Sequence, residues 1–365
     1  REAARETLKM GDSDYFSQRG YALAQFGRGN REPVVVMRSQ TEYGWSSHCY
    51  LVGAFYHLWG FRPISVKWMN ALFGAGLVVL VFGLGQFLFR SPAIARWSAT
   101  AVTLWPSLIL WSASNLKESL VTLCSALLLL AGLNIFWGRD RRSRVRSALI
   151  FALLAGLHGT LRSGIYTGSL AASLFAGWLL FRPQRLRWRL AILLLLAGAA
   201  VWFFPKIQER FFQALYFHIT NQAIPGVSYQ FLPSEWYLPN AYQEMAPDPT
   251  PKPGFMLMAA GGGLWHYLVE PLPQRLDSLS TLAWYPVMLV WYLLLPFMAW
   301  GAWSALRENF RPAFCFLLFL CAWSVLGALS NGNVGTLIRM RDMLTPFFLI
   351  LASAGAWKSL NPRPA

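Results

Sequence analysis

Long apolar runs separated by short polar stretches dominate this chain of 365 residues. A helix needs about 20 predominantly apolar residues to cross a bilayer, within a range of roughly 17 to 25. Nine segments meet or nearly meet this length, and the shortest, 147–161, is expected to extend back to Ser143. The nine are 64–89, 94–113, 117–137, 147–161, 165–181, 189–205, 282–304, 313–330 and 343–358. The pattern predicts an all-α polytopic membrane protein with about nine transmembrane helices.

The basic residues are distributed unevenly between the two sides that this topology creates. The connections 90–96, 138–146, 182–189 and 305–312, with the tail 358–365, carry 15 of the 32 Lys and Arg residues and two acidic ones. Cytoplasmic loops of membrane proteins carry such an excess of Lys and Arg. We therefore expect these connections on the cytoplasmic side. The net charge of +16 is then mainly an orientation signal, and it does not indicate nucleic-acid binding.

This orientation sets where the two ends of the chain lie. Nine spans with the carboxyl terminus inside place Arg1 on the outer side. Because a polytopic chain needs a signal or first span to bring that end across, we expect a further span ahead of Arg1. The expected organisation is an outer segment 1–62, six spans in 63–205, a large outer loop 206–281 and three spans in 282–365.

The outer segments carry helical signals of their own. Residues 8–29 and 45–60 mix aromatic with polar side chains, which is typical of helices at the membrane interface. The loop 206–281 is rich in proline, so its middle is not expected to be a long helix. Short surface helices are expected at 206–220 and 264–276, and the run Gly261-Gly262-Gly263 is expected to form a sharp turn. A loop of this size favours a substrate-covering element.

Carboxylates on the outer side are candidates for a catalytic base. Asp12 and Asp14 lie in the run Gly11-Asp12-Ser13-Asp14-Tyr15, and Lys117-Glu118 lies between two predicted spans. Side chains at i and i+2 of a helix do not face each other, so one aspartate is expected to act and the other to support it. The competing interpretations are a solvated acidic turn for the aspartates and a hydrated connection for Lys117-Glu118.

Three arginines lie on the predicted outer side, against the general charge bias. Arg162 follows the span 147–161, and Arg339 and Arg341 precede the last span. A guanidinium binds a phosphate group with two parallel hydrogen bonds. We expect at least one of the three to bind phosphate, although pairing with Glu118 or Asp342 is the simpler alternative.

Histidines and cysteines form no recognisable metal or disulfide pattern. The spacing of the five histidines matches no zinc site, and each is interpreted as structural. The four cysteines do not form a disulfide framework. The residues are His48, His57, His158, His218 and His266, and Cys49, Cys124, Cys315 and Cys321.

Several short motifs, taken together and in order, resemble the GT-C class of membrane glycosyltransferases. The likeness is to bacterial relatives of the protein mannosyltransferase and lipid-A aminoarabinose transferase group, and it spans most of the chain. The motifs are Gly11–Tyr15 with Tyr21–Ala24, Leu58–Phe61 with Val66–Gly74, Leu104–Pro106 through Ser114–Glu118, and Asn333–Pro346. The loop 206–281 matches no catalytic domain of the class.

The resemblance implies a multi-pass protein of the bacterial plasma membrane with its active site on the periplasmic face. It implies inverting transfer of a sugar from a polyprenyl-phosphate donor to a lipid, glycan or protein acceptor. Asp14, with Asp12 second, would be the general base, Lys117 and Glu118 would line the acceptor cavity, and Arg162, Arg339 and Arg341 would bind the donor phosphate. Lys117-Glu118 replaces a paired acidic motif of some relatives, so a Mg²⁺ or Mn²⁺ ion held by Asp14 and Glu118 is left open.

Two other functions fit parts of the pattern. A polymerase or ligase for lipid-linked glycans would share the many spans, the large outer loop and the outer arginines. A lipid or glycan flippase would place ionisable groups near the bilayer midplane. Here the spans are nearly free of charge and the ionisable residues gather at their outer ends, which favours chemistry at the outer face.

Overall fold

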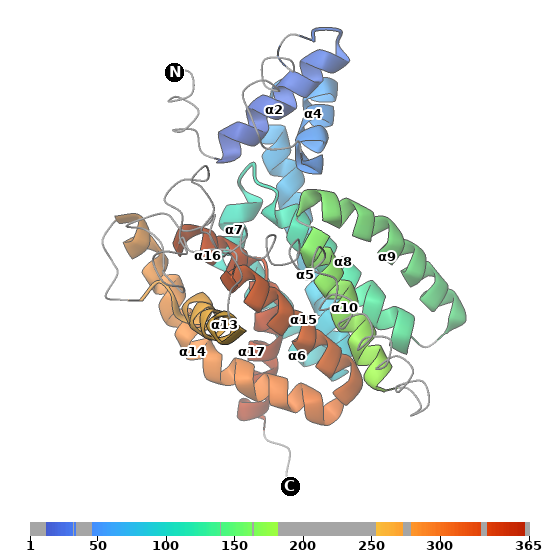
Figure 1. Cartoon of the computed structure of the whole chain (residues 1–365), viewed down its shortest axis with the longest axis vertical. Helices are drawn as coiled ribbons and strands as arrows, with labels where there is room; N and C mark the ends of the chain where they lie inside the picture. Colours follow the sequence, from blue (N-terminus) through green and yellow to red (C-terminus); the bar gives the residue numbers. More distant parts are fainter. Residues whose placement is uncertain are drawn as a thin grey trace. The chain divides into compact units, whose positions relative to one another are not determined.

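The computed structural model describes residues 12–31, 33, 46–138, 140–162, 164–181, 253–272, 279–329 and 334–361. All regular elements in these residues are α-helices (Figure 1). In chain order they are α2 (Asp12–Gly27), α4 (Ser47–Trp59), α5 (Pro63–Phe89), α6 (Pro92–Leu104), α7 (Pro106–Ser112), α8 (Glu118–Trp137), α9 (Arg141–Leu161), α10 (Gly164–Leu180), α13 (Pro253–Val269), α14 (Leu279–Glu308), α15 (Phe310–Leu329), α16 (Val334–Asp342) and α17 (Thr345–Leu360). The expected all-α architecture is confirmed for this part of the chain.

The chain divides into two compact units. Unit 1 comprises residues 1–168 and 349–365, and unit 2 comprises residues 169–348. Unit 1 therefore holds α2 to α9, and unit 2 holds α13 to α16, while α10 and α17 begin in one unit and end in the other.

Several helices are long and apolar enough to cross a membrane, so the chain is a helical membrane protein. Among the described residues these are α5, α8, α14 and α15, with α16 and α17 as a bent pair that makes a fifth span if it is counted as one. They confirm the predicted spans 64–89, 117–137, 282–304 and 313–330 as apolar helices of sufficient length. The count of nine is not confirmed, and the predicted span 189–205 lies outside the described residues.

Two predicted spans differ in detail from the helices observed. The segment 94–113 is broken into α6 and α7 at Trp105, because Pro106 has no N–H to continue the first helix and instead begins the second. The segment 147–161 belongs to a longer helix, α9, which begins at Arg141 with Asp140 as its amino-terminal cap. The Asp140 Oδ1 accepts a hydrogen bond from the Ser143 N–H at 2.6 Å.

The expected sharp turn at Gly261-Gly262-Gly263 is wrong, because these residues lie inside α13. The helix begins at Pro253, which fits the first position of a helix, and it packs on α15 in unit 2. A Cβ atom at Gly263 would lie 3.3 Å from the Ala328 Cβ, and one at Gly327 would lie 2.9 Å from the Tyr267 ring. These glycines therefore allow close helix–helix contact, as small residues do between membrane helices. The expected helix 206–220 and the proline-rich middle of the loop lie outside the described residues.

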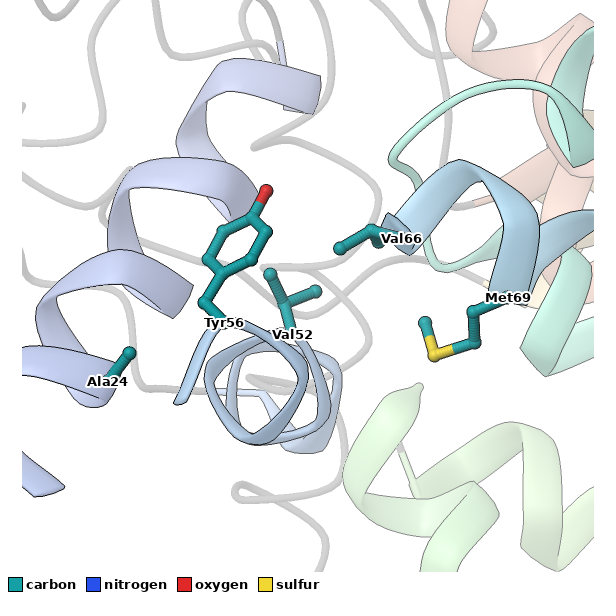
Figure 2. Packing of buried hydrophobic residues seen from close by; sticks show 5 residues of the cluster. All are labelled: Ala24, Val52, Tyr56, Val66 and Met69. Carbon is teal, nitrogen blue, oxygen red and sulfur yellow. The ribbon is translucent and has the colours of Figure 1, made fainter. Parts of the chain in front are cut away.

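In unit 1, α2 and α4 pack side by side and run in the same direction (Figure 1). Contacts advance together along both helices, from Phe16 against His48 to Gly20 against Val52. A Cβ atom at Gly20 would lie 2.3 Å from the Val52 Cγ1, so only glycine permits this approach. Figure 2 shows Ala24 of α2, Val52 and Tyr56 of α4, and Val66 and Met69 of α5 in one buried cluster. The expected interfacial helices 8–29 and 45–60 thus exist as α2 and α4, and the pair packs on the start of α5.

Candidate functional site

Three elements of unit 1 meet at a buried polar cluster. They are the first turns of α2, the start of α4 and the connection 113–117 that leads into α8. Phe16 of α2, Cys49 of α4 and Leu116 of the connection form its apolar side. The polar side chains gathered there are Ser17, His48, Asn115, Lys117 and Glu118.

The connection before α8 is held in place by Asn70 of α5. The Asn70 Nδ2 donates hydrogen bonds to the carbonyl oxygens of Ser114, at 2.7 Å, and Leu116, at 2.9 Å. These carbonyls lie in the connection between α7 and α8, outside both helices. The adjacent Asn115 Nδ2 donates to the Ser17 Oγ on α2. Asn70 and Asn115 thereby fix the connection against both α5 and α2.

His48 is the most unusual residue of the cluster. Its side chain is fully buried, with an exposed fraction of 0%. Neither ring nitrogen makes a hydrogen bond with the part of the chain that the structure describes. Burial lowers the pKa of His48 to about 4, with Lys117 acting in the same direction and Glu118 and Asn115 opposing it. Buried polar groups without hydrogen bonds are costly and are rare in folded proteins.

The structure places Glu118 inside this cluster and Asp14 at its edge. Glu118 is the first residue of α8, and only 3% of it is exposed. Asp12, Ser13 and Asp14 lie in the first turn of α2, so the two aspartates occupy positions i and i+2 of a helix. Asp14 is exposed, while Phe16, two residues further, is buried against Leu116. The Lys117 Nζ lies 6.0 Å from the centre of the Phe16 ring.

Arg162 lies close to the same end of α4. It follows the last residue of α9, and its guanidinium lies 5.4 Å from the centre of the Tyr166 ring. Two residues earlier, the Thr160 Oγ1 accepts a hydrogen bond from the Ser47 Oγ at the start of α4. The end of α9 that carries Arg162 therefore lies beside the helix that carries His48.

The second buried histidine of unit 1 has a different environment. The Ser125 Oγ donates to the Val121 carbonyl and so can accept from the His158 Nε2, at 3.1 Å. The Thr167 hydroxyl then donates to the His158 Nδ1, at 2.6 Å. Both ring nitrogens are satisfied, and His158 links α8, α9 and α10, which supports its structural interpretation.

In unit 2, Arg341 binds the carboxyl end of α13. Its Nη1 donates to the carbonyl oxygens of Tyr267, at 3.2 Å, and Glu270, at 2.7 Å. Its guanidinium also lies 5.1 Å from the centre of the Trp291 ring, and only 3% of Arg341 is exposed. Arg341 thus acts as a helix cap, whereas Arg339, on the same helix α16, is partly exposed.

A carboxylate–histidine pair lies at the same end of α13. The His266 Nδ1 is 3.1 Å from the Glu270 Oε1, and the Glu270 Oε2 accepts the Leu272 N–H at 2.8 Å. The side chain of Glu270 is fully buried, whereas 24% of the His266 side chain is exposed. Tyr267 and Tyr292 close the arrangement by donating to the carbonyls of Met340 and Val269.

The metal site that the sequence leaves open involves Asp14 and Glu118. No group of three or more His, Cys, Asp or Glu side chains there is arranged to hold a metal ion. Asp14 lies at the surface and Glu118 is buried.

Sequence reasoning did not identify several residues that the structure brings into these sites. From the sequence, His48 and His266 are interpreted as structural, Asn70 is one position of the motif Val66–Gly74, and Glu270 carries no signal beyond its polarity. The one available indication was a polar or acidic residue inside or beside an apolar run, because such residues are costly in a membrane.

No protein-family model, curated protein or solved structure matches the chain.

Proposed function

We propose that this protein is a membrane glycosyltransferase. It would move a sugar from a polyprenyl-phosphate donor to a lipid, glycan or protein hydroxyl on the outer face of the bacterial plasma membrane. The proposal builds on the resemblance to the GT-C class and on the cluster in unit 1.

The observation that carries the proposal is the meeting of three separate segments at His48. The resemblance requires the first outer segment and the second outer connection to share one site. In the structure, α2 contacts that connection through Phe16 against Leu116 and through the bond from Asn115 to Ser17. The start of α4 joins them through His48 and is bonded to the end of α9. Asp14, Lys117, Glu118 and Arg162 thus belong to one region of unit 1.

The chemistry of an inverting transfer matches the groups in this region. A carboxylate of Asp14 takes the proton from the acceptor hydroxyl as its oxygen attacks the anomeric carbon of the sugar. The bond from that carbon to the phosphate oxygen breaks with its electron pair, and polyprenyl phosphate leaves as the anion. A positioned general base contributes about 10²–10⁴-fold to such a rate.

The partly exposed arginines are suited to the departing phosphate. Arg162 in unit 1 would offset the charge that develops on the leaving group. In unit 2, Arg339 keeps the phosphate-binding role that the resemblance implies, and Arg341 fixes the end of α13 next to α16.

The test is sugar transfer by the purified full-length chain in lipid nanodiscs, with a radiolabelled polyprenyl-phosphate sugar and a lipid-linked glycan acceptor. Asp14→Asn is expected to lower kcat at least about 100-fold, because the amide cannot accept the proton. Glu308→Gln is the matched control, since Glu308 is an exposed carboxylate at the end of α14. It should leave kcat unchanged.

Product analysis separates the proposal from its alternatives. One sugar added per acceptor supports the transferase, and a ladder of long products would identify a polymerase or ligase. Movement of the donor across the bilayer without a new glycosidic bond would identify a flippase. Unchanged kcat in Asp14→Asn would remove this residue from the mechanism.

A further inference from the structure

We propose that the outward face of α9 binds an anionic phospholipid of the cytoplasmic leaflet. Arg142 and Arg146 contact the lipid phosphate. Leu149 and Leu153 lie along one acyl chain. The inference does not rest on the proposed function, and it assigns a ligand to basic residues that the sequence explains only as an orientation signal.

The packing of α9 on the span α8 fixes the level of its first turns in the membrane (Figure 1). The Asn134 Nδ2 of α8 lies 3.2 Å from the Ser143 Oγ and 3.3 Å from the Ser147 Oγ of α9. Further along, the Ser125 Oγ of α8 lies 3.1 Å from the His158 Nε2 of α9. The two helices are therefore antiparallel, and α9 begins level with the end of α8. Because α8 is long and apolar enough to cross a bilayer, α9 begins at one face of the membrane.

The start of α9 is strongly basic and exposed. Its four exposed arginines are Arg141, Arg142, Arg144 and Arg146. No carboxylate of the residues that the structure describes forms an ion pair with any of them. The nearest acid in the sequence, Asp140, accepts the Ser143 N–H through its Oδ1. Cations near the amino end of a helix oppose its dipole, and like charges four residues apart repel each other. The arrangement is unfavourable by itself, and a bound anion would offset both effects.

The same face of α9 becomes apolar beyond the arginines. Positions 142, 146, 149 and 153 are spaced i, i+4, i+7 and i+11, so they form one stripe along the helix. Leu149 and Leu153 are 68% and 77% exposed. Ser147 and His158, which are on the other side of the helix, are buried and contact α8. Since α9 packs along a span by that side, its exposed leucines lie at the depth of the acyl chains.

This order of charged and apolar side chains matches the chemistry of a phospholipid. A guanidinium binds a phosphate with two parallel hydrogen bonds, and the apolar chains extend from the phosphate into the bilayer. Trp137, at the end of α8, is of the residue type that is enriched at headgroup level. The connection 138–146 is expected on the cytoplasmic side, where anionic lipids attract Lys and Arg near the membrane. An acidic protein would meet the arginines alone, whereas a phospholipid meets both the arginines and the leucines.

The test uses the full-length chain in phosphatidylcholine nanodiscs that contain a varied fraction of phosphatidylglycerol with a photoactivatable acyl chain. Mass spectrometry measures the lipid attached to residues 147–161. The fraction of phosphatidylglycerol at half-maximal labelling gives the apparent affinity. Arg142→Gln and Arg146→Gln are each expected to weaken binding about 5-fold, and the double variant about 30-fold. Both positions are exposed, so the variants should fold as the wild type does.

The matched control is the double variant Arg90→Gln/Arg96→Gln. It removes the same charge from exposed positions of unit 1 on the same expected side of the membrane, and it should retain the wild-type affinity. A wild-type affinity in Arg142→Gln/Arg146→Gln would overturn the proposal. So would equal labelling by phosphatidylcholine with the same photoactivatable chain, because the phosphate charge would then not be recognised.

Two further outcomes would identify a different occupant and would likewise overturn the proposal. Loss of labelling in an excess of inorganic phosphate would show that a free anion occupies the arginines. A cross-link from α9 to a second copy of the chain, in place of a lipid adduct, would show a protein interface. No readout involves sugar transfer, so the result stands apart from success or failure of the proposed function.

Discussion

The cluster around His48 in unit 1 and the end of α13 in unit 2 are both buried and polar, but they differ in how their hydrogen bonds are made. At the end of α13, Arg341 and Tyr292 bind backbone carbonyls and Glu270 is bonded through both oxygens. Around His48, both ring nitrogens and the Asn115 Oδ1 have no hydrogen bond within the described residues.

The difference indicates what each region contributes. A bonded network stabilises and orients, so the end of α13 is built to hold His266 and α16 in place. Buried polar atoms left without bonds lower stability, and such costs are retained mainly where they serve function. The comparison therefore predicts opposite responses to substitution in the two regions.

The largest expected effect is loss of the Arg341 cap. Arg341→Met leaves the carbonyls of Tyr267 and Glu270 buried without their donor, and it should lower the free energy of unfolding by about 3–5 kcal/mol. Arg339 lies two residues away and is partly exposed, so Arg339→Met should lower the free energy of unfolding by less than about 1 kcal/mol. The same substitution should weaken binding of the donor. Unfolding in mixed detergent micelles measures both values. Equal losses of stability would remove the distinction between a structural and a phosphate-binding arginine.

The second largest expected effect is a pH dependence of stability that His48 causes. Its pKa is lowered from 6.5 to about 4 by burial, so between these values the unfolded chain binds a proton that the folded chain does not. Stability should then fall as pH drops from about 6.5 towards 4, by up to about 3 kcal/mol for this group. The measurement is the difference in unfolding free energy between wild type and His48→Leu at several pH values, which subtracts the other titrating groups. A difference that stays constant over this range would contradict the burial of His48.

The smallest expected effect is a difference in stability at neutral pH between variants of the two buried histidines of unit 1. His158→Leu removes a partner from both Ser125 and Thr167 and should cost about 1–3 kcal/mol. His48→Leu removes no hydrogen bond to the described residues, so stability should change by less than about 1 kcal/mol, while sugar transfer is lost. Thermal unfolding of the purified variants measures the first quantity, and the transfer assay measures the second. Full activity in His48→Leu would show that the buried ring nitrogens of His48 have no role in sugar transfer.

Helix length and composition made much of the fold predictable. The predicted spans 64–89 and 117–137 agree with α5 and α8 within one residue at each end, because apolar length decides which segments cross a bilayer. The same rule missed α13, since three consecutive glycines and many prolines are typical of loops in water. Between packed helices, Gly263 instead allows the approach to Ala328.

The sites were less predictable, because they depend on contacts between distant segments. Glu118 and Arg162 could be identified as costly charges near predicted spans. Nothing local to His48 shows that it will be buried beside Asn115, which follows it by more than sixty residues. Nor does the sequence show that Arg341 will cap α13, because that contact joins helices separated by α14 and α15.

The parallel course of α2 and α4 has an electrostatic consequence. Each α-helix carries a partial positive charge of about half a unit at its amino end, from backbone N–H groups that no carbonyl satisfies. Since α2 and α4 run in the same direction, both amino ends lie at the cluster, and α8 begins there with Glu118. Three helix dipoles thus converge on one carboxylate. The fold itself creates at this point a field that stabilises negative charge, before any lysine or arginine side chain is considered.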